Sequence, residues 1–199
     1  MIDIEIDMKK EVAAIEKSLG SLKKKAPSVL AKAINVTAKE ARTTLAKKAQ
    51  ESYAVKGGNF NKAMKVKKAT AGHLTATLHA TGSPMEIKDF KVSPGNVPAQ
   101  DARPDITKGK VLKSSGMKVL QKGNLKAFIA KFKSGHVSVV QRKGPLRLPL
   151  KKLLSPAIPQ MLGSEHKVYG VVKPQIEKNL QKNIGIQIEK LLAREAAKA

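Results

Sequence analysis

The chain has 199 residues, a formal net charge of +24, 41% hydrophobic residues and only 3% aromatic residues. Its length suits one domain, and the scarcity of aromatics predicts an aliphatic, alanine-rich core. Cysteine is absent, which excludes disulfides and thiolate metal sites and suits a reducing compartment. There is neither an apolar run of about 20 residues nor a signal-peptide pattern. We therefore expect a soluble protein that is made in the cytoplasm and has no membrane partner.

The first quarter of the chain predicts a strand and two helices. Residues 1–7 alternate isoleucine with aspartate or glutamate, which is the period-2 pattern of a half-buried strand. Apolar residues at helical spacing predict a helix over 8–22, ended by Gly20 and the lysines that follow. A second helix is expected from near Pro27, whose fixed φ suits a first helical turn, to Tyr53.

From residue 58 onward, short segments rich in threonine and valine alternate with glycine and proline. The pattern predicts antiparallel turns around Gly72, Gly82 and Gly135. Three prolines and little apolar periodicity between 93 and 110 predict a long, exposed and mobile loop. The expected strands are 64–69, 74–80, 86–92, 111–120, 126–132 and 137–142.

The last quarter is predicted to be helical. A short helix is expected from the Ser155–Pro156 pair to Gly163, and a long one from Val168 to Leu191 or Leu192, with Pro174 as a kink or as its first turn. The sequence thus predicts an α+β fold: N-terminal helices, an antiparallel sheet or small sandwich in the middle, and a long C-terminal helix. We expect a single domain, with strand and helices over 1–57, a β-rich region over 58–152 with its exposed loop at 93–110, and C-terminal helices over 153–199.

The main charge feature is the segment 106–164, which contains thirteen lysines and arginines and no aspartate or glutamate. Clustered like charges repel one another, so the segment predicts a polyanion or an acidic partner. The alternative is a sheet with one solvated face. Lysine predominates and stacking aromatics are scarce, so any nucleic-acid contact should be independent of sequence. The candidate residues for facing DNA or another polyanion are Lys108, Lys110, Lys113, Lys118 and Lys122.

Nothing in the sequence predicts catalysis, a metal site or a cofactor. There is no zinc-binding spacing and no glycine-rich phosphate loop. Asp101 and Asp105 share the long loop, which would position a pair of carboxylates poorly. We therefore expect that the protein is not an enzyme. We expect each of its four histidines to be structural or simply exposed to solvent: His73, His79, His136 and His166.

Several stretches resemble a known protein family. A strand over 127–130 is followed by a turn at 133–136 and by a second strand over 139–142 that ends in Gln-Arg. A loop over 146–150 with the order Arg-x-Pro, and then the segment 155–158, complete the pattern. Upstream, 33–35 and 37–38 in an alanine-rich helix correspond too, as does the basic segment 62–68. From about residue 31 to 162, the chain resembles the minor tail protein Z, or tail completion, family of long-tailed bacteriophages. It departs from the family pattern at Val137, where an aromatic is frequent, and in the loop 93–110.

The resemblance implies a virion protein of the neck, assembled in the host cytoplasm. Its implied partners are further copies in a hexameric ring, the tail terminator, the head-completion proteins and, without sequence specificity, packaged double-stranded DNA. The first and last helices would then supply interfaces between subunits, or else cover the protein's own sheet. A ribosome- or nucleoid-associated protein that binds nucleic acid without sequence preference is the alternative. The structural or interface candidates are Phe128, Gly135, Arg142, Arg147 and Pro149.

Overall fold

The computed structural model describes residues 1–7, 15, 17, 19–57, 60–99 and 104–198. All strand pairs among these residues are antiparallel, so the fold is α+β, as the sequence predicts. In chain order the elements are β1 (Ile2–Asp7), the 3-10 helix η1 (Gly20–Lys25), α2 (Ala26–Ser52), α3 (Phe60–Ala63), β2 (Met64–Lys67), β3 (Thr75–Ala80), β4 (Met85–Glu86), the 3-10 helix η2 (Ile87–Asp89), β5 (Lys91–Ser93), β6 (Lys108–Lys110), β7 (Lys118–Val119), β8 (Gln121–Lys122), β9 (Leu125–Lys131), β10 (Val137–Arg142), β11 (Leu150–Lys152), β12 (Leu154–Ser155), α4 (Ile158–Leu162) and α5 (Tyr169–Ala196).

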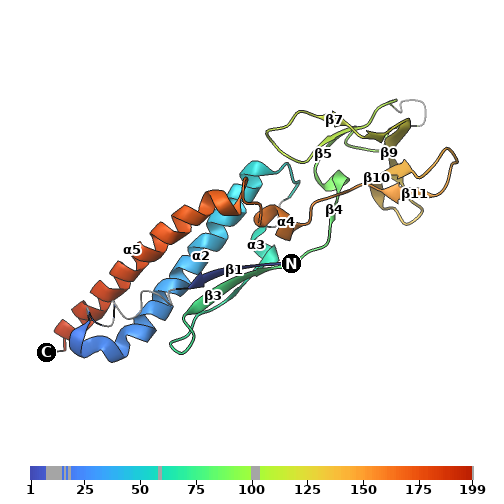
Figure 1. Ribbon diagram of the computed structural model, residues 1–199. Helices are drawn as coiled ribbons and strands as arrows, with labels where there is room; N and C mark the ends of the chain where they lie inside the picture. Colours follow the sequence, from blue (N-terminus) through green and yellow to red (C-terminus); the bar gives the residue numbers. More distant parts are fainter. Residues whose placement is uncertain (8–14, 16, 18, 58–59, 100–103, 199) are drawn as a thin grey trace.

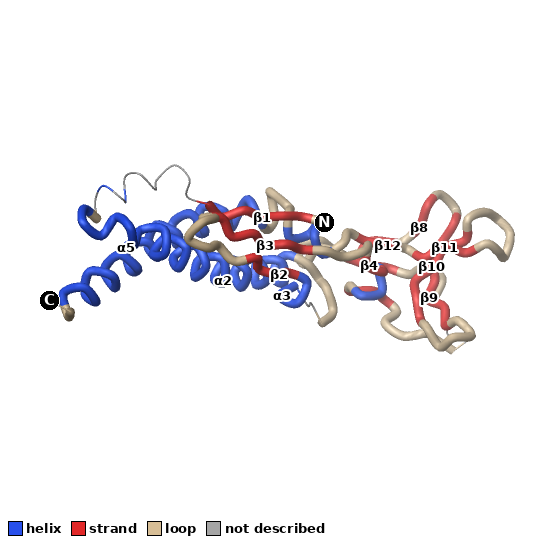
Figure 2. The backbone as a smooth tube through the Cα atoms, turned by 90° about the horizontal axis from the view of Figure 1, so that it is seen from below, coloured by secondary structure: helices blue, strands red, loops and turns tan. Residues whose placement is uncertain are grey.

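The molecule is elongated, with a helical part at one end and a β-rich part at the other (Figures 1 and 2). Helices α2 and α5 lie side by side, and the C-terminus lies at the end of this pair that is far from the β-rich part. The sheet of order β1-β3-β2 runs along α2. Strands β4 and β12 pair with each other where the chain crosses from one part to the other and back.

Helix α2 is the centre of the larger core because it packs both on the sheet and on α5. Small side chains let these neighbours approach closely, and the buried residues of α2 include Ala26, Ala31, Ala33, Ala38, Ala41, Ala46 and Ala49. The apolar stripe of α5 meets this core at Val172, Ile176, Leu180 and Ile184. That stripe is therefore buried within the chain, chiefly against α2, whereas the sequence predicted a cover for the sheet or an interface between subunits.

A buried polar contact fixes the position of α5 against α2. The Asn183 side-chain amide donates to the Thr37 hydroxyl and to the Glu40 carboxylate, each at 3.0 Å. Thr37 in turn donates to the Ala33 carbonyl, one helical turn earlier. A slip of either helix would leave these buried groups unpaired, and that costs free energy, so the contact sets the register of the pair.

The β-rich part has a smaller core of its own, between sheets of order β11-β10-β9-β8 and β5-β6-β7. Gly135 makes the turn from β9 to β10 with a φ of +82°, a conformation that favours glycine. The buried Gln141 side chain donates to the Leu125 carbonyl. The residues of this core are Ile87, Val92, Ala127, Ile129 and Val139. That the whole chain folds as one domain stays a prediction.

The structure confirms strands close to 64–69, 74–80, 126–132 and 137–142, whereas the predicted strands 86–92 and 111–120 are wrong. The first is broken by η2, because Ile87 and Phe90 are both buried and lie three residues apart, which is a helical spacing. In the second, the stretch at Leu112 pairs with the end of α2 instead: the Ala54 amide donates to the Val111 carbonyl.

Other expectations also change. The loop 93–110 is shorter than predicted, since it ends in β6 with Thr107 and Gly109 buried. Gly82 does not make an antiparallel turn, because β3 and β4 do not pair with each other. Pro174 is not in the first turn of α5, which begins at Tyr169 and continues through the proline. Most of the helix predicted over 8–22 lies outside the described residues.

Replacing Asn183 by alanine should lower the free energy of unfolding by about 1–3 kcal/mol, because Glu40 loses a hydrogen bond and a buried amide is removed. Urea unfolding followed by circular dichroism measures this. Lys182→Ala, an exposed change on the same helix, is the control and should stay within about 0.5 kcal/mol of wild type. Equal effects of the two substitutions would contradict the role of Asn183.

Candidate polyanion-facing surface

The five lysines expected to face a polyanion all lie in the β-rich part. Lys108 and Lys110 are on β6, Lys118 is on β7, Lys122 is on β8, and Lys113 lies between β6 and β7. Lys110 is half-buried and its ammonium donates to the Lys113 carbonyl at 3.0 Å, while the other four side chains are exposed. All five thus lie in one part of the molecule, but Lys118 pairs with Gly109 and is therefore on the other face of the β6–β7 pair from Lys108 and Lys110.

The five lysines form no ion pair with any described residue. Lys110 lies directly opposite Lys91 in the β5–β6 register, and like charges in such a pair are destabilising. Of the thirteen basic residues between 106 and 164, Lys152 is the single one with an ion pair among the described residues. The described residues thus offer little counter-charge for this surface, which favours an acidic partner.

The candidate interface residues lie at the opposite edge of the β-rich part or in its turns. Phe128 is half-buried on β9, opposite Val140 on β10, and Gly135 is in the turn between these strands. Arg142 ends β10, opposite Leu150, and its side chain is exposed. Arg147 and Pro149 are exposed in the loop from β10 to β11. Arg142 lines one pocket together with Lys122, one of the five lysines.

The loop between β10 and β11 also exposes apolar side chains. Leu146 and Leu148 are 74% and 64% exposed on either side of Arg147. Two highly exposed leucines in one loop are unusual on a surface that only contacts water. This loop is therefore the part of the interface set that best fits contact with another protein.

Glu86, which the sequence analysis did not single out, links strand β4 to the β-rich part. Its carboxylate accepts a hydrogen bond from Lys152 at 2.8 Å and lies 3.0 Å from Nε2 of His136. Burial alone would raise the pKa of Glu86, but contacts led by the Lys152 hydrogen bond outweigh it and lower the pKa to about 2. The pairing ties β4 to β11 and to the residue before β10. No sequence pattern marks it, since its members lie up to 66 residues apart.

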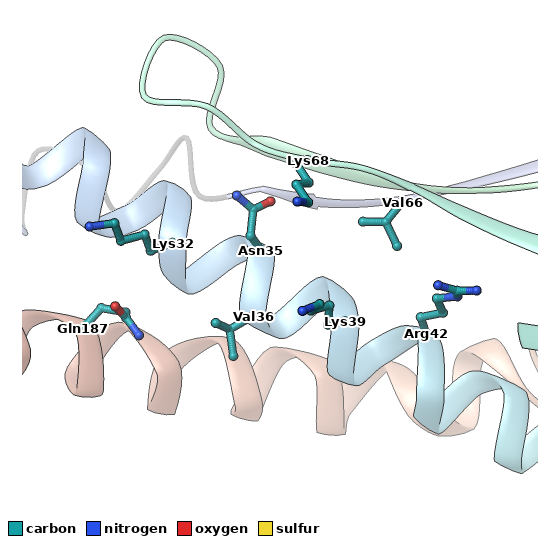
Figure 3. A pocket seen from close by; sticks show the side chains of 8 residues that line it. All are labelled: Lys32, Asn35, Val36, Lys39, Arg42, Val66, Lys68 and Gln187. Atoms are coloured by element: carbon teal, nitrogen blue, oxygen red, sulfur yellow. The ribbon is translucent and has the colours of Figure 1, made fainter.

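A basic groove beside α2 was missed as well (Figure 3). It has a volume of about 550 Å³, lies between α2 and the strand region that ends in Lys68, and is closed at one side by Gln187 of α5. Asn35 borders it and binds the backbone of Ala69 twice, donating to the carbonyl at 2.9 Å and accepting from the amide at 2.8 Å. The spacing of Lys32, Lys39 and Arg42 on one helical stripe was the available sequence signal.

The remaining polar candidates form no reactive site. His79 pairs with Asp3, and Asp105 is exposed, while Asp101 lies outside the described residues. Within the described part of the chain, no three histidine, aspartate or glutamate side chains are grouped so as to hold a metal ion. None of the described helices has the length and apolar character of a membrane span.

The family model of prophage minor tail protein Z (GPZ) matches residues 8–194. The chain belongs to this family. The match extends beyond 31–162, where the resemblance was seen, and takes in nearly all of α5. No curated protein and no solved structure gives a significant match. The family membership makes the chain a structural protein of the phage tail and a component of the virion.

The residues that carry the resemblance to minor tail protein Z are explained by packing. Ala33 and Ala38 are buried in α2, while Asn35 and Thr37 make the side-chain contacts to β2's end and to α5. Gln141 bridges the strands of the β-rich part. These positions hold the fold together, and none of them belongs to the lysine surface.

Glu86→Gln should destabilise the protein at neutral pH by about 1 kcal/mol, a modest value because its partners are partly exposed. The folded-state pKa of Glu86, about 2, lies below its ordinary value of 4.5. Its contribution is therefore present above pH 4.5 and is lost as the pH falls toward 2. Urea unfolding of both proteins between pH 2 and pH 7 tests this. Asp105→Asn is the control, and a stability gap that does not shrink in acid would contradict the assignment.

Proposed function

We propose that this member of the minor tail protein Z family completes the tail at the neck and helps to join it to the head. In this proposal its basic β-rich part faces packaged DNA or acidic neighbouring proteins, and its copies form a hexameric ring. The observation that carries the proposal is the uncompensated charge of 106–164, including the pairing of Lys91 with Lys110. The role of a phage tail component comes from the family.

A neck position fits this kind of surface. Double-stranded DNA that passes through a ring presents phosphates to the protein at every position along its length, whatever its sequence. The affinity of the ring for DNA must therefore come from charge rather than from contacts to bases. Exposed lysines act as separate point charges and impose no groove geometry. A surface of this kind attracts DNA without holding one sequence in place, which suits DNA that must later leave through the tail.

The exposed leucines of the β10–β11 loop support a second contact, to a protein. Leu146 and Leu148 lie on either side of Arg147, and the loop that carries them lies at the end of the molecule that is remote from the C-terminus (Figure 1). The proposed partners for this loop are the tail terminator or the head-completion proteins. The alternative of a ribosome- or nucleoid-associated protein is disfavoured by the family match over 8–194.

Phage particles assembled without this protein should contain filled heads and separate tails, or tails joined without DNA seated at the neck. Electron microscopy of lysates from a phage that lacks the gene measures the fraction of joined particles. Supplying the wild-type chain from a plasmid should restore joining. Normal joining with correctly seated DNA in its absence would contradict the proposal.

Changing Lys108, Lys110, Lys113, Lys118 and Lys122 to glutamine should weaken binding to duplex DNA or polyphosphate and flatten its salt dependence. Each lost contact to a DNA phosphate reduces the slope of log K against log salt by about 0.9. The matched control replaces exposed lysines of the helical part, namely Lys24, Lys47, Lys178, Lys182 and Lys190. Fluorescence anisotropy measures both variants. Equal losses, or a large shift in melting temperature with unchanged binding, would contradict the assignment of this surface.

A further inference from the structure

The sheet of the helical part has two free edges. Its order is β1-β3-β2, and no described strand pairs with the outer side of β1 or of β2. Free edges can pair with another chain, so proteins normally protect them. The charges on these two edges are opposite in sign, which suggests a specific use for them.

The strand register makes the opposition regular. Across the solvent face, Asp3 on β1 is opposite His79 on β3, which is opposite Lys65 on β2. The next row runs in the same way from Glu5 through Thr77 to Lys67. Each row thus begins with an acid at one edge and ends with a lysine at the other. Asp3 pairs with His79, while Glu5, Lys65 and Lys67 have no ion pair among the described residues.

The inner face of the sheet shows a matching apolar row. It runs from Ile4 through Leu78 to Val66, and Val66 is only half-buried. Beyond Val66 lies the basic groove, where Val36 of α2 is 37% exposed (Figure 3). Lys39 and Lys68 border the groove and have no ion pair among the described residues. At the β2 edge, the apolar row therefore ends in the accessible surface of Val66 and Val36, which lysines border.

We propose that β1 of a second copy of this chain adds to the outer edge of β2. Asp3 and Glu5 of that copy then lie beside Lys65 and Lys67, and Ile4 between them lies beside Val66 on the inner face while it stays in its own core. The occupant matches both features of the edge: it alternates isoleucine with acidic residues, and the edge alternates apolar residues with lysines. DNA fits less well, because a phosphate backbone offers neither a strand for the edge nor an apolar group for the valines.

The proposed contact has a defined geometry. Strands β1 and β2 are both antiparallel to β3, so they are parallel to each other. Repeating one operation that places β1 of each new copy beside β2 of the last gives a head-to-tail interface, which closes as a ring when the rotation allows it. The inference rests on the ring assembly proposed above and names the surfaces that form it.

Cysteine cross-linking tests the contact, because the chain contains no cysteine of its own. In a protein with both Glu5→Cys and Lys67→Cys, the two residues of one chain flank Thr77 on separate strands, about 9.6 Å apart. A disulfide needs Cα atoms within about 7 Å, so a cross-link can form only between copies. Mild oxidation of the purified protein should give a ladder of covalent oligomers. The control, Glu5→Cys with Lys122→Cys, should give none.

Charge exchange gives an independent test by analytical ultracentrifugation. Asp3→Lys with Glu5→Lys, and separately Lys65→Glu with Lys67→Glu, should each weaken self-association at least about tenfold. Mixing these two variants should restore it, because each then meets the opposite charge at both edges. Lys118→Glu with Lys122→Glu makes the same charge change in the β-rich part and should leave self-association intact, with circular dichroism checking the fold of all variants.

The inference is overturned if the protein with Glu5→Cys and Lys67→Cys gives no cross-linked oligomers, or if mixing the two charge-exchanged variants does not restore self-association. Failure of this contact is distinguishable from failure of the proposed function. If the copies cross-link but the five-lysine variant binds polyanions as wild type does, only the proposed role of the basic surface is contradicted. The converse result contradicts only the strand-addition interface.

Discussion

The burial of α2 on two sides is the constraint on which the rest of the structure depends. The helix lies between the sheet β1-β3-β2 and α5, and its buried alanines let both approach closely. This arrangement uses the apolar stripe of α5 within the chain, and it fixes the two helices by the Asn183–Thr37 contact. The sheet packs mainly on α2, residues of β1 also line a pocket with α5, and no described strand pairs with the outer side of β1 or of β2. The helical part is thus a rigid body with open edges, which suits a subunit that repeats.

The β-rich part serves a different purpose on the same body. It has its own small core, it is joined by the β4–β12 pair, and Glu86 anchors that connection through Lys152 and His136. Apart from this anchor, its lysines and arginines form no ion pair among the described residues. The two parts therefore divide the work in the proposed assembly: the helical part supplies contacts between copies, and the β-rich part supplies the charged surface and the exposed leucines of the β10–β11 loop.

Periodicity and composition were enough to predict the α+β class, the long helices and the hairpin at Gly135, since these depend on neighbours in the sequence. They failed where long-range contacts decide. Ile87 is buried in the smaller core, where η2 contacts β10, whereas Phe90 is buried in the larger core. Val111 and Leu112 pair with the end of α2. The charged surfaces show the same difference. The lysines of 106–164 can be seen in one segment of the sequence, whereas the opposite charges of β1 and β2 are recognised only in the structure, where β3 aligns the two strands.

The central claim is that the β-rich part faces DNA or an acidic neighbouring protein in the particle, while the helical part does not. The most direct measurement attaches a photo-cross-linker to a cysteine introduced at Lys118 or, separately, at Lys190 of α5, in phage particles assembled with each variant. The account predicts cross-links from position 118 to DNA or to a different virion protein, and none to DNA from position 190. Cross-links to DNA from position 190, with none to DNA or to another protein from position 118, would contradict it.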